Sequence, residues 1–228
     1  MSGASFLVIP QWQGSGSSRA MRLIDGAEAI LGDLPVSRTH VVTVPAAADE
    51  ALGTGVQRYS SLTAIRELAA AEVEVIAEPV VTVGGDGSAD LASIQHAASA
   101  HPGDALALVW FDAHGDLKDV ATSPSGAFHG IALRALLGDG PEGLASTGSA
   151  VLKPSSVVLA GSAHWTRASR PSWPRAASGS SNRATSMTRT PSSAPSRPPE
   201  RPRCICTSTW MCSTRRWWTG SGLPNRSG

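Results

Sequence analysis

The stretch that decides the fold is LVWFDAHGD, residues 108–116, in which an apolar run passes directly into polar residues. Consecutive apolar residues are typical of strands buried on both faces of a parallel sheet, so residues 105–111 are predicted to form such a strand. Ligands of open parallel sheets gather beyond the carboxyl ends of the strands. The polar residues that follow Phe111 are therefore candidates for a functional site.

Outward from this stretch, short apolar runs alternate with amphipathic segments along residues 5–164. This alternation is typical of an α/β fold with a mostly parallel sheet. The apolar spacing predicts strands at 6–10, 40–44, 73–83, 105–111 and 156–160, and helices at 19–34, 59–71, 88–100 and 129–137.

The polar residues after the strand form a D-x-H-x-D pattern of Asp112, His114 and Asp116. In extended backbone this alternate spacing points all three side chains to one side. Two carboxylates and an imidazole suit a divalent ion such as Mn²⁺. The alternative is that Asp116 caps the next segment and His114 is an ordinary surface histidine. Their place directly after a buried strand favours the metal site.

A second polar motif, SPSGAFHG at 123–130, places His129 at the start of a predicted helix. Taken alone, His129 is more simply an ordinary helix-start residue. Beside a metal site, however, an imidazole that titrates near neutrality suits proton transfer.

Three motifs in this order resemble those of the arginase, agmatinase and formimidoylglutamase (ureohydrolase) superfamily: GGDGS at 84–88, WFDAHGDL at 110–117 and TSPSGAFHG at 122–130. The segment 8–30 is similar to a bacterial arginase-like branch, and the resemblance covers about residues 5–164. It implies a three-layer arginase/deacetylase-like α/β fold with a mostly parallel sheet and two manganese ions at the carboxyl ends of its strands. A deacetylase of the related fold is less favoured by these motifs.

The resemblance also implies a role for each matching residue. Asp112 would bridge the two manganese ions, His114 would bind one and Asp116 the other. His129 would be the catalytic proton shuttle, and Ser125 would lie in the loop that binds the far end of the substrate. The implied reaction is hydrolysis of a guanidino or formimino carbon–nitrogen bond of a small molecule, by water whose pKa the metals lower. Members of the family are homo-oligomers.

This sequence departs from the family pattern in three respects: a metal ligand, the residues that hold arginine, and the second ligand motif. Gly87 stands where the family has a histidine or cysteine ligand, and Lys118 and Ala127 stand where arginases have asparagines that hold arginine. The second ligand motif, close to D-x-D-x-x-D-P, is missing, since no aspartate follows Asp139. We therefore expect one manganese ion or fewer to be held well, and impaired activity. The alternative is a non-catalytic remnant or binding protein on the same scaffold.

The last 64 residues, 165–228, differ in composition from the rest of the chain. They contain 11 Arg and one Glu, whereas residues 1–164 contain 8 Lys and Arg against 17 Asp and Glu. With no Val or Phe, they cannot bury enough apolar surface to offset the entropy of folding. We expect a partial ureohydrolase domain at 1–164, followed by a disordered or poorly packed tail.

This tail has the composition of a G+C-rich coding sequence read in the wrong frame. Regrouping the codons of residues 203–215 permits the string V-Y-L-H-I-D-L-D-V-L-D-P, and the unique codons of Trp210 and Met211 force its second Asp and the Val that follows. We therefore predict a frameshift from about residue 162. The competing hypothesis is a genuine basic extension that binds a polyanion, although nucleic acid is the less favoured partner.

The positions of the cysteines and of the apolar runs indicate where in the cell the protein is expected. All three cysteines lie in the tail, and their spacing does not match a structural zinc site. The apolar run at 6–10 lacks the length and basic leader of a signal peptide, and no run approaches the length of a membrane span. The sequence thus predicts a cytoplasmic protein that does not interact with membranes.

Overall fold

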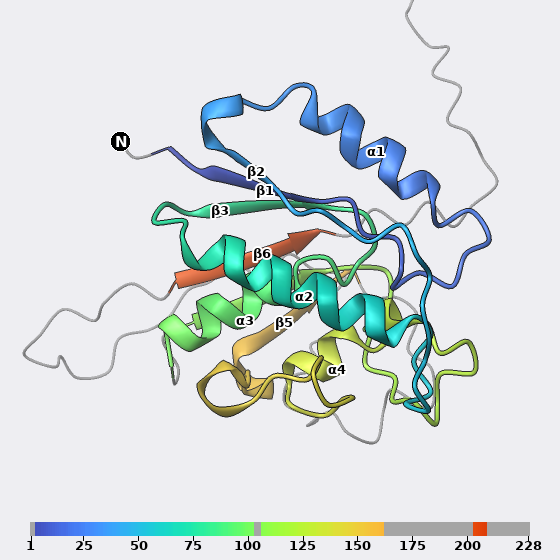
Figure 1. The fold of residues 1–228 in the computed structure, drawn as a ribbon. Helices are drawn as coiled ribbons and strands as arrows, with labels where there is room; N and C mark the ends of the chain where they lie inside the picture. Colours follow the sequence, from blue (N-terminus) through green and yellow to red (C-terminus); the bar gives the residue numbers. More distant parts are fainter. Residues whose placement is uncertain (1–2, 103–105, 162–202, 209–228) are drawn as a thin grey trace, which may run out of the picture.

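The computed structural model describes residues 3–102, 106–161 and 203–208 of the chain, the last range as a backbone strand only. Its strands form two parallel three-stranded sheets (Figure 1). The first has the order β2-β1-β3 and the second the order β5-β4-β6. The strands are β1 (Ser5–Ile9), β2 (Thr39–Val41), β3 (Val80–Gly84), β4 (Leu106–Phe111), β5 (Val157–Ala160) and β6 (Arg203–Ser208).

Helices pack on both sides of the first sheet, with α1 on one side and α2 on the other in Figure 1. The helices are α1 (Arg22–Leu31), α2 (Tyr59–Glu74), α3 (Leu91–Ala100) and α4 (Ala132–Leu136), with 3₁₀ turns at Val36–Arg38, Phe128–Gly130, Gly148–Ala150 and Pro154–Ser156. The predicted layered α/β fold with a mostly parallel sheet is confirmed.

Two apolar clusters hold these layers together. In the first sheet, Leu7 and Ile9 pack against Ile65 and Ala69 of α2. In the second, Leu108 and Trp110 are fully buried in a cluster with residues of α3 and α4. The alternate side chains of β4 and β5 are less covered, since Phe111 is 48% exposed and Val158 is 54% exposed. The second sheet therefore has one buried face and one half-exposed apolar face.

The strand predicted at 73–83 is wrong in its first half. Residues as far as Glu74 belong to α2, and β3 begins only at Val80. The reason is that Val73 and Ile76 are buried at the three-residue spacing of a helix, while Val75 between them is 72% exposed. A short apolar run fits a strand and a helix equally well by periodicity.

The tail contains one element that the expectation of a disordered or poorly packed segment did not include. Residues Arg203–Ser208 form β6, which pairs in parallel with β4 from Leu106↔Arg203 to Phe111↔Ser208. Strand pairing uses backbone groups, and this segment contains no proline, so it can satisfy the open edge of β4 whatever its side chains are. The rest of the predicted tail lies outside the described residues.

Among the helices in the described ranges, none combines the length and the hydropathy that a transmembrane span requires.

Candidate metal and proton-transfer site

The D-x-H-x-D motif begins where β4 ends. Asp112 is buried, and its backbone N–H donates to the Ala160 carbonyl at 3.1 Å, which extends the pairing of β4 with β5 by one residue. Its carboxylate Oδ1 accepts a hydrogen bond from the His114 backbone N–H at 2.8 Å and lies 3.4 Å from His114 Nδ1. The turn after β4 therefore brings Asp112 and His114 together.

The extended backbone predicted through Asp116 is not observed. Asp116 has a φ of 47°, in the left-handed region that residues with a β-carbon rarely adopt. The chain turns after β4 because the Asp112 carboxylate accepts from the His114 N–H and bends the backbone locally. The prediction that alternate spacing alone aligns Asp112, His114 and Asp116 was wrong in this detail.

The turn nevertheless brings the Asp116 carboxyl close to that of Asp112. The pKa of Asp116 is raised to about 8, first by burial and then by the charge of Asp112 and a hydrogen bond to it. The Trp110 indole N–H and the Lys118 ammonium act in the opposite direction. Two buried carboxyls repel each other when both are ionised, and a bound cation would remove that repulsion.

The donor chemistry of this site fits a divalent cation, but the described residues supply only part of a centre. Carboxylate and imidazole groups suit manganese. However, the part of the chain that the structure describes contains no group of three or more His, Cys, Asp or Glu placed to hold an ion. A complete ion site is therefore not present among the described residues.

His129 lies in the 3₁₀ turn Phe128–Gly130, ahead of α4 rather than at the start of one continuous helix as predicted. Its backbone N–H donates to the Gly14 carbonyl at 3.0 Å, which ties it to the loop that follows β1. The position of His129 is thus fixed by two loops that are distant in sequence.

The electrostatic environment of His129 includes Asp112 and His114 of the D-x-H-x-D pattern. Burial lowers its pKa, as do the charges of Lys118 and His114, while Asp86 and Asp112 act to raise it. The net lowering favours the neutral imidazole near pH 7, which can accept a proton. Side chains from three separate sequence motifs therefore interact electrostatically in one region.

Ser125 lies at an exposed position in the loop before His129. Its hydroxyl accepts from the Ala127 backbone N–H at 3.3 Å. A β-carbon added at Gly16 would come 3.1 Å from that of Ala127, so the loop after β1 packs closely on this loop. Ser125 is therefore exposed to solvent beside the loop after β1.

Asp86 of the GGDGS motif was not among the predicted site residues. Asp86 is buried, and its carboxylate accepts from the Gly14 N–H at 2.8 Å, the Ser88 N–H at 2.9 Å and Gln11 Nε2 at 3.2 Å. It joins the loop after β1 to the loop after β3, and the two strands themselves are hydrogen-bonded neighbours. Both loops follow predicted strands, so Asp86 was a possible candidate. The sequence did not show, however, that these two strands pair with each other. Gly87 of the same motif offers no side chain to a metal.

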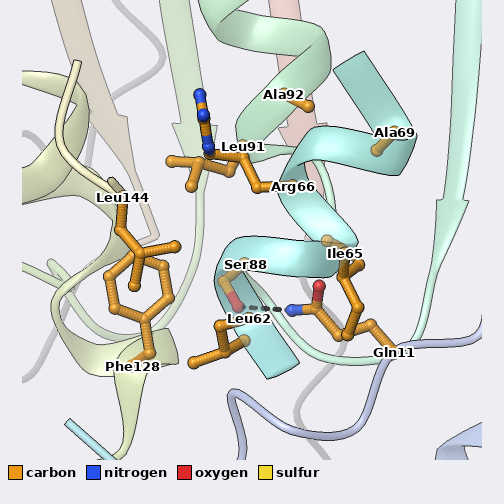
Figure 2. Close-up of a pocket in the computed structure, with 11 residues that line it drawn as sticks. Gln11, Leu62, Ile65, Arg66, Ala69, Ser88, Leu91, Ala92, Phe128 and Leu144 are labelled. Carbon is orange, nitrogen blue, oxygen red and sulfur yellow. Dashed lines mark hydrogen bonds between the residues drawn. The ribbon is translucent and has the colours of Figure 1, made fainter. Parts of the chain in front are cut away.

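A small pocket lies next to this junction, between α2 and α3 (Figure 2). The hydrogen bond from Gln11 Nε2 to Ser88 Oγ, 2.7 Å long, closes one side, and the rest of the lining is largely apolar, with Ile65, Phe128 and Leu144. None of the predicted site residues lines this pocket, which lies in the apolar packing between the helices.

Asp90, just before α3, provides a pH-dependent prediction. Its pKa is raised to about 7, chiefly by burial, with its own backbone N–H opposing the rise and the charge of Asp86 adding to it. Between about pH 4 and 7 the native state therefore holds a proton that the unfolded chain has lost, so stability falls as the pH rises. We expect Asp90→Asn to stabilise the protein at pH 8 by ~1–2 kcal/mol, since residual exposure weakens the effect, and hardly at all at pH 4.

Urea unfolding at both pH values measures this difference. An equal gain at pH 4 and pH 8 would mean that asparagine acts as a helix cap and that the Asp90 carboxyl does not titrate as described.

Comparison with known proteins gives a consistent family assignment. A sequence model described as "Arginase family" matches residues 15–182. The arginase of Staphylococcus aureus (strain COL) is 37% identical over 136 residues, which are 57% of this chain and 44% of that protein. The arginase of Bacillus subtilis (strain 168) is 36% identical over 137 residues, or 58% of this chain and 42% of that protein. The chain spans less than half the length of these relatives.

Solved structures agree with the sequence comparisons. The native arginase of Bacillus caldovelox at pH 5.6 is similar with a TM-score of 0.52 and 25% identity, over 70% of this chain and 57% of that one. The Entamoeba histolytica arginase in complex with L-ornithine gives a TM-score of 0.53 and 25% identity, over 68% and 56%. The predicted arginase-like fold class is confirmed by these similarities.

Proposed function

The chain belongs to the arginase family, and from this premise we propose that it carries an impaired active site of a manganese-dependent ureohydrolase. The proposed reaction is hydrolysis of a guanidino or formimino carbon–nitrogen bond of a small molecule. The relatives described above, from Staphylococcus aureus and Bacillus subtilis, are arginases. Arginine itself is not favoured as the substrate, because Lys118 and Ala127 replace the asparagines that the family resemblance leads us to expect.

The observation that carries the proposal is the meeting of three motifs around His129. Its pKa is influenced by the charges of Asp86, Asp112 and His114, which come from the two other motifs, and by that of Lys118, which follows the second. Neighbouring titratable groups with opposite effects are typical of catalytic sites. A structural ion pair on the surface does not account for a half-buried imidazole whose pKa responds to the charges of the buried residues Asp86 and Asp112.

In this proposal Asp112, His114 and Asp116 hold manganese. The metal supplies Lewis-acid chemistry and lowers the pKa of water when bound. The closeness of the Asp112 and Asp116 carboxyls supports this assignment, because a bound cation would allow both carboxyls to ionise side by side.

The proposed proton shuttle is His129. A lowered pKa keeps its imidazole neutral near pH 7, so it can accept a proton from one reacting group and return it to the leaving amine. Its backbone bond to Gly14 fixes the ring's starting point. Ser125, exposed in the loop before His129, is the proposed contact for the far end of the substrate.

The proposed impairment rests on missing ligands. Gly87 has no side chain, and no Asp follows Asp139. We infer that the missing carboxylates were lost through a frameshift near residue 162. This is supported by the register of β6, in which Ser208 lies opposite Phe111. The first Asp of the regrouped string would come directly after this strand, beside Asp112.

Manganese binding tests the proposed site. We expect the chain as written to bind Mn²⁺ weakly, with a dissociation constant far above that of a complete centre, because three ligands from one segment leave the ion largely hydrated. Titration followed by electron paramagnetic resonance should show this binding, and Asp112→Ala should abolish it. Asp33→Ala, at an exposed position on the loop after α1, is the matched control.

Two tight manganese sites in this chain would contradict the proposed impairment. The alternative function, a non-catalytic remnant or binding protein with a basic polyanion-binding tail, is favoured by the incomplete ligand set of the described residues. It predicts no Asp112-dependent metal binding, and salt-dependent retention on an anionic polymer.

A further inference from the structure

Arg134 of α4 reaches back to the segment that carries the metal motif. Its side chain is only 14% exposed. Its Nη1 donates to the Leu117 carbonyl at 3.4 Å and lies 3.6 Å from Asp119 Oδ2. Its Nε donates to Asp139 Oδ2 at 2.8 Å, so a carboxylate on the far side of the guanidinium fixes its orientation.

Backbone bonds from the same region hold the same segment. The Arg134 backbone N–H donates to the Asp116 carbonyl at 3.3 Å, and the Lys118 N–H donates to the Gly130 carbonyl at 3.1 Å. The segment 116–119 is thus held at four successive residues by α4 and the turn that precedes it.

This segment needs to be held, because its backbone is strained. The left-handed conformation of Asp116 is unfavourable for a residue with a side chain. Without external contacts the turn would relax towards an ordinary backbone conformation.

We propose that Arg134 is a positioning residue for the metal-binding segment: it holds 116–119 in the turn that keeps the Asp116 carboxyl beside Asp112. The inference rests on the proposed function, since a cation is what this pair would bind. Arg134 acts through Leu117 and Asp119 and is not itself a ligand. Its planar fork bonds a carbonyl and two carboxylates at once, a geometry that lysine cannot reproduce.

The test uses the full chain with Arg134→Gln and Arg134→Lys, and two measurements. We expect Arg134→Gln to weaken Mn²⁺ binding by about tenfold in paramagnetic resonance titrations, with partial recovery in Arg134→Lys. Without metal, hydrogen exchange of the peptide spanning 112–122 should be faster by at least about tenfold. Arg66→Gln is the control, because the hydrogen bond of Arg66 goes to Gln95 on α3.

Each outcome decides one of the two proposals. If the unmodified chain binds no Mn²⁺ through Asp112, the proposed metal site fails, and the exchange measurement alone decides the role of Arg134. Unchanged exchange at 112–122 in Arg134→Gln overturns the inference, as does faster exchange with unchanged Mn²⁺ affinity. If Arg134→Gln does not fold, Asp139→Asn, at an exposed position, loosens the same guanidinium and should give a smaller change in the same direction.

Discussion

Restoring the reading frame near residue 162 should raise the rate of hydrolysis of guanidino or formimino substrates at least a thousandfold over that of the 228-residue chain. The reason is that this chain lacks the second group of carboxylate ligands, and losing a ligand sphere costs several kcal/mol of transition-state stabilisation. Each ~1.4 kcal/mol changes the rate about tenfold. Urea or ammonia release from arginine, agmatine and formimidoylglutamate, with added manganese, measures the difference.

The matched control is the restored chain carrying His129→Ala, which should lose most of the recovered activity while keeping its metal. Manganese-dependent turnover of the 228-residue chain on the order of 10 per second, an ordinary enzyme rate, would contradict both the impairment and the frameshift hypothesis.

The restored chain and the 228-residue chain should also differ in how manganese changes their thermal unfolding. A complete centre binds metal only in the native state, so manganese at a hundred times its dissociation constant should stabilise the restored chain by ~2.7 kcal/mol. The 228-residue chain should show a broad transition that manganese hardly moves. Calorimetry with manganese and with a chelator measures both effects.

A sharp thermal unfolding transition of the 228-residue chain that shifts when manganese is added would contradict this prediction. Protection of residues 165–228 from protease in the same chain would further mean that the tail is a genuine part of the fold.

The sequence was sufficient for the strands that form the frame of the site. The apolar run ending at Phe111 was long and abrupt, so β4 and the polar turn after it could be located closely. The run at 73–83 could not be divided, because the helical spacing of Val73 and Ile76 becomes informative only when α2 has a sheet to pack against.

The geometry of the site depended on interactions that spacing does not encode. The left-handed turn at Asp116 follows from a bond between Asp112 and the His114 backbone, and from contacts with α4. The role of Asp86 depended on the pairing of β1 with β3. The strand at 203–208 was not predicted, because the expectation for the tail was based on the composition of its side chains. An open strand edge, by contrast, binds a partner strand through backbone hydrogen bonds.

The half-exposed face of β4 and β5 affects how the protein responds to heat and denaturant. Phe111 and Val158 already keep about half of their surface in contact with water in the native state. Unfolding can therefore hydrate less new apolar surface at these strands than in a sheet covered on both faces. The heat capacity change of unfolding and the slope of the unfolding free energy against urea both scale with newly exposed surface. These two side chains therefore contribute less to both quantities than they would in a sheet covered on both faces.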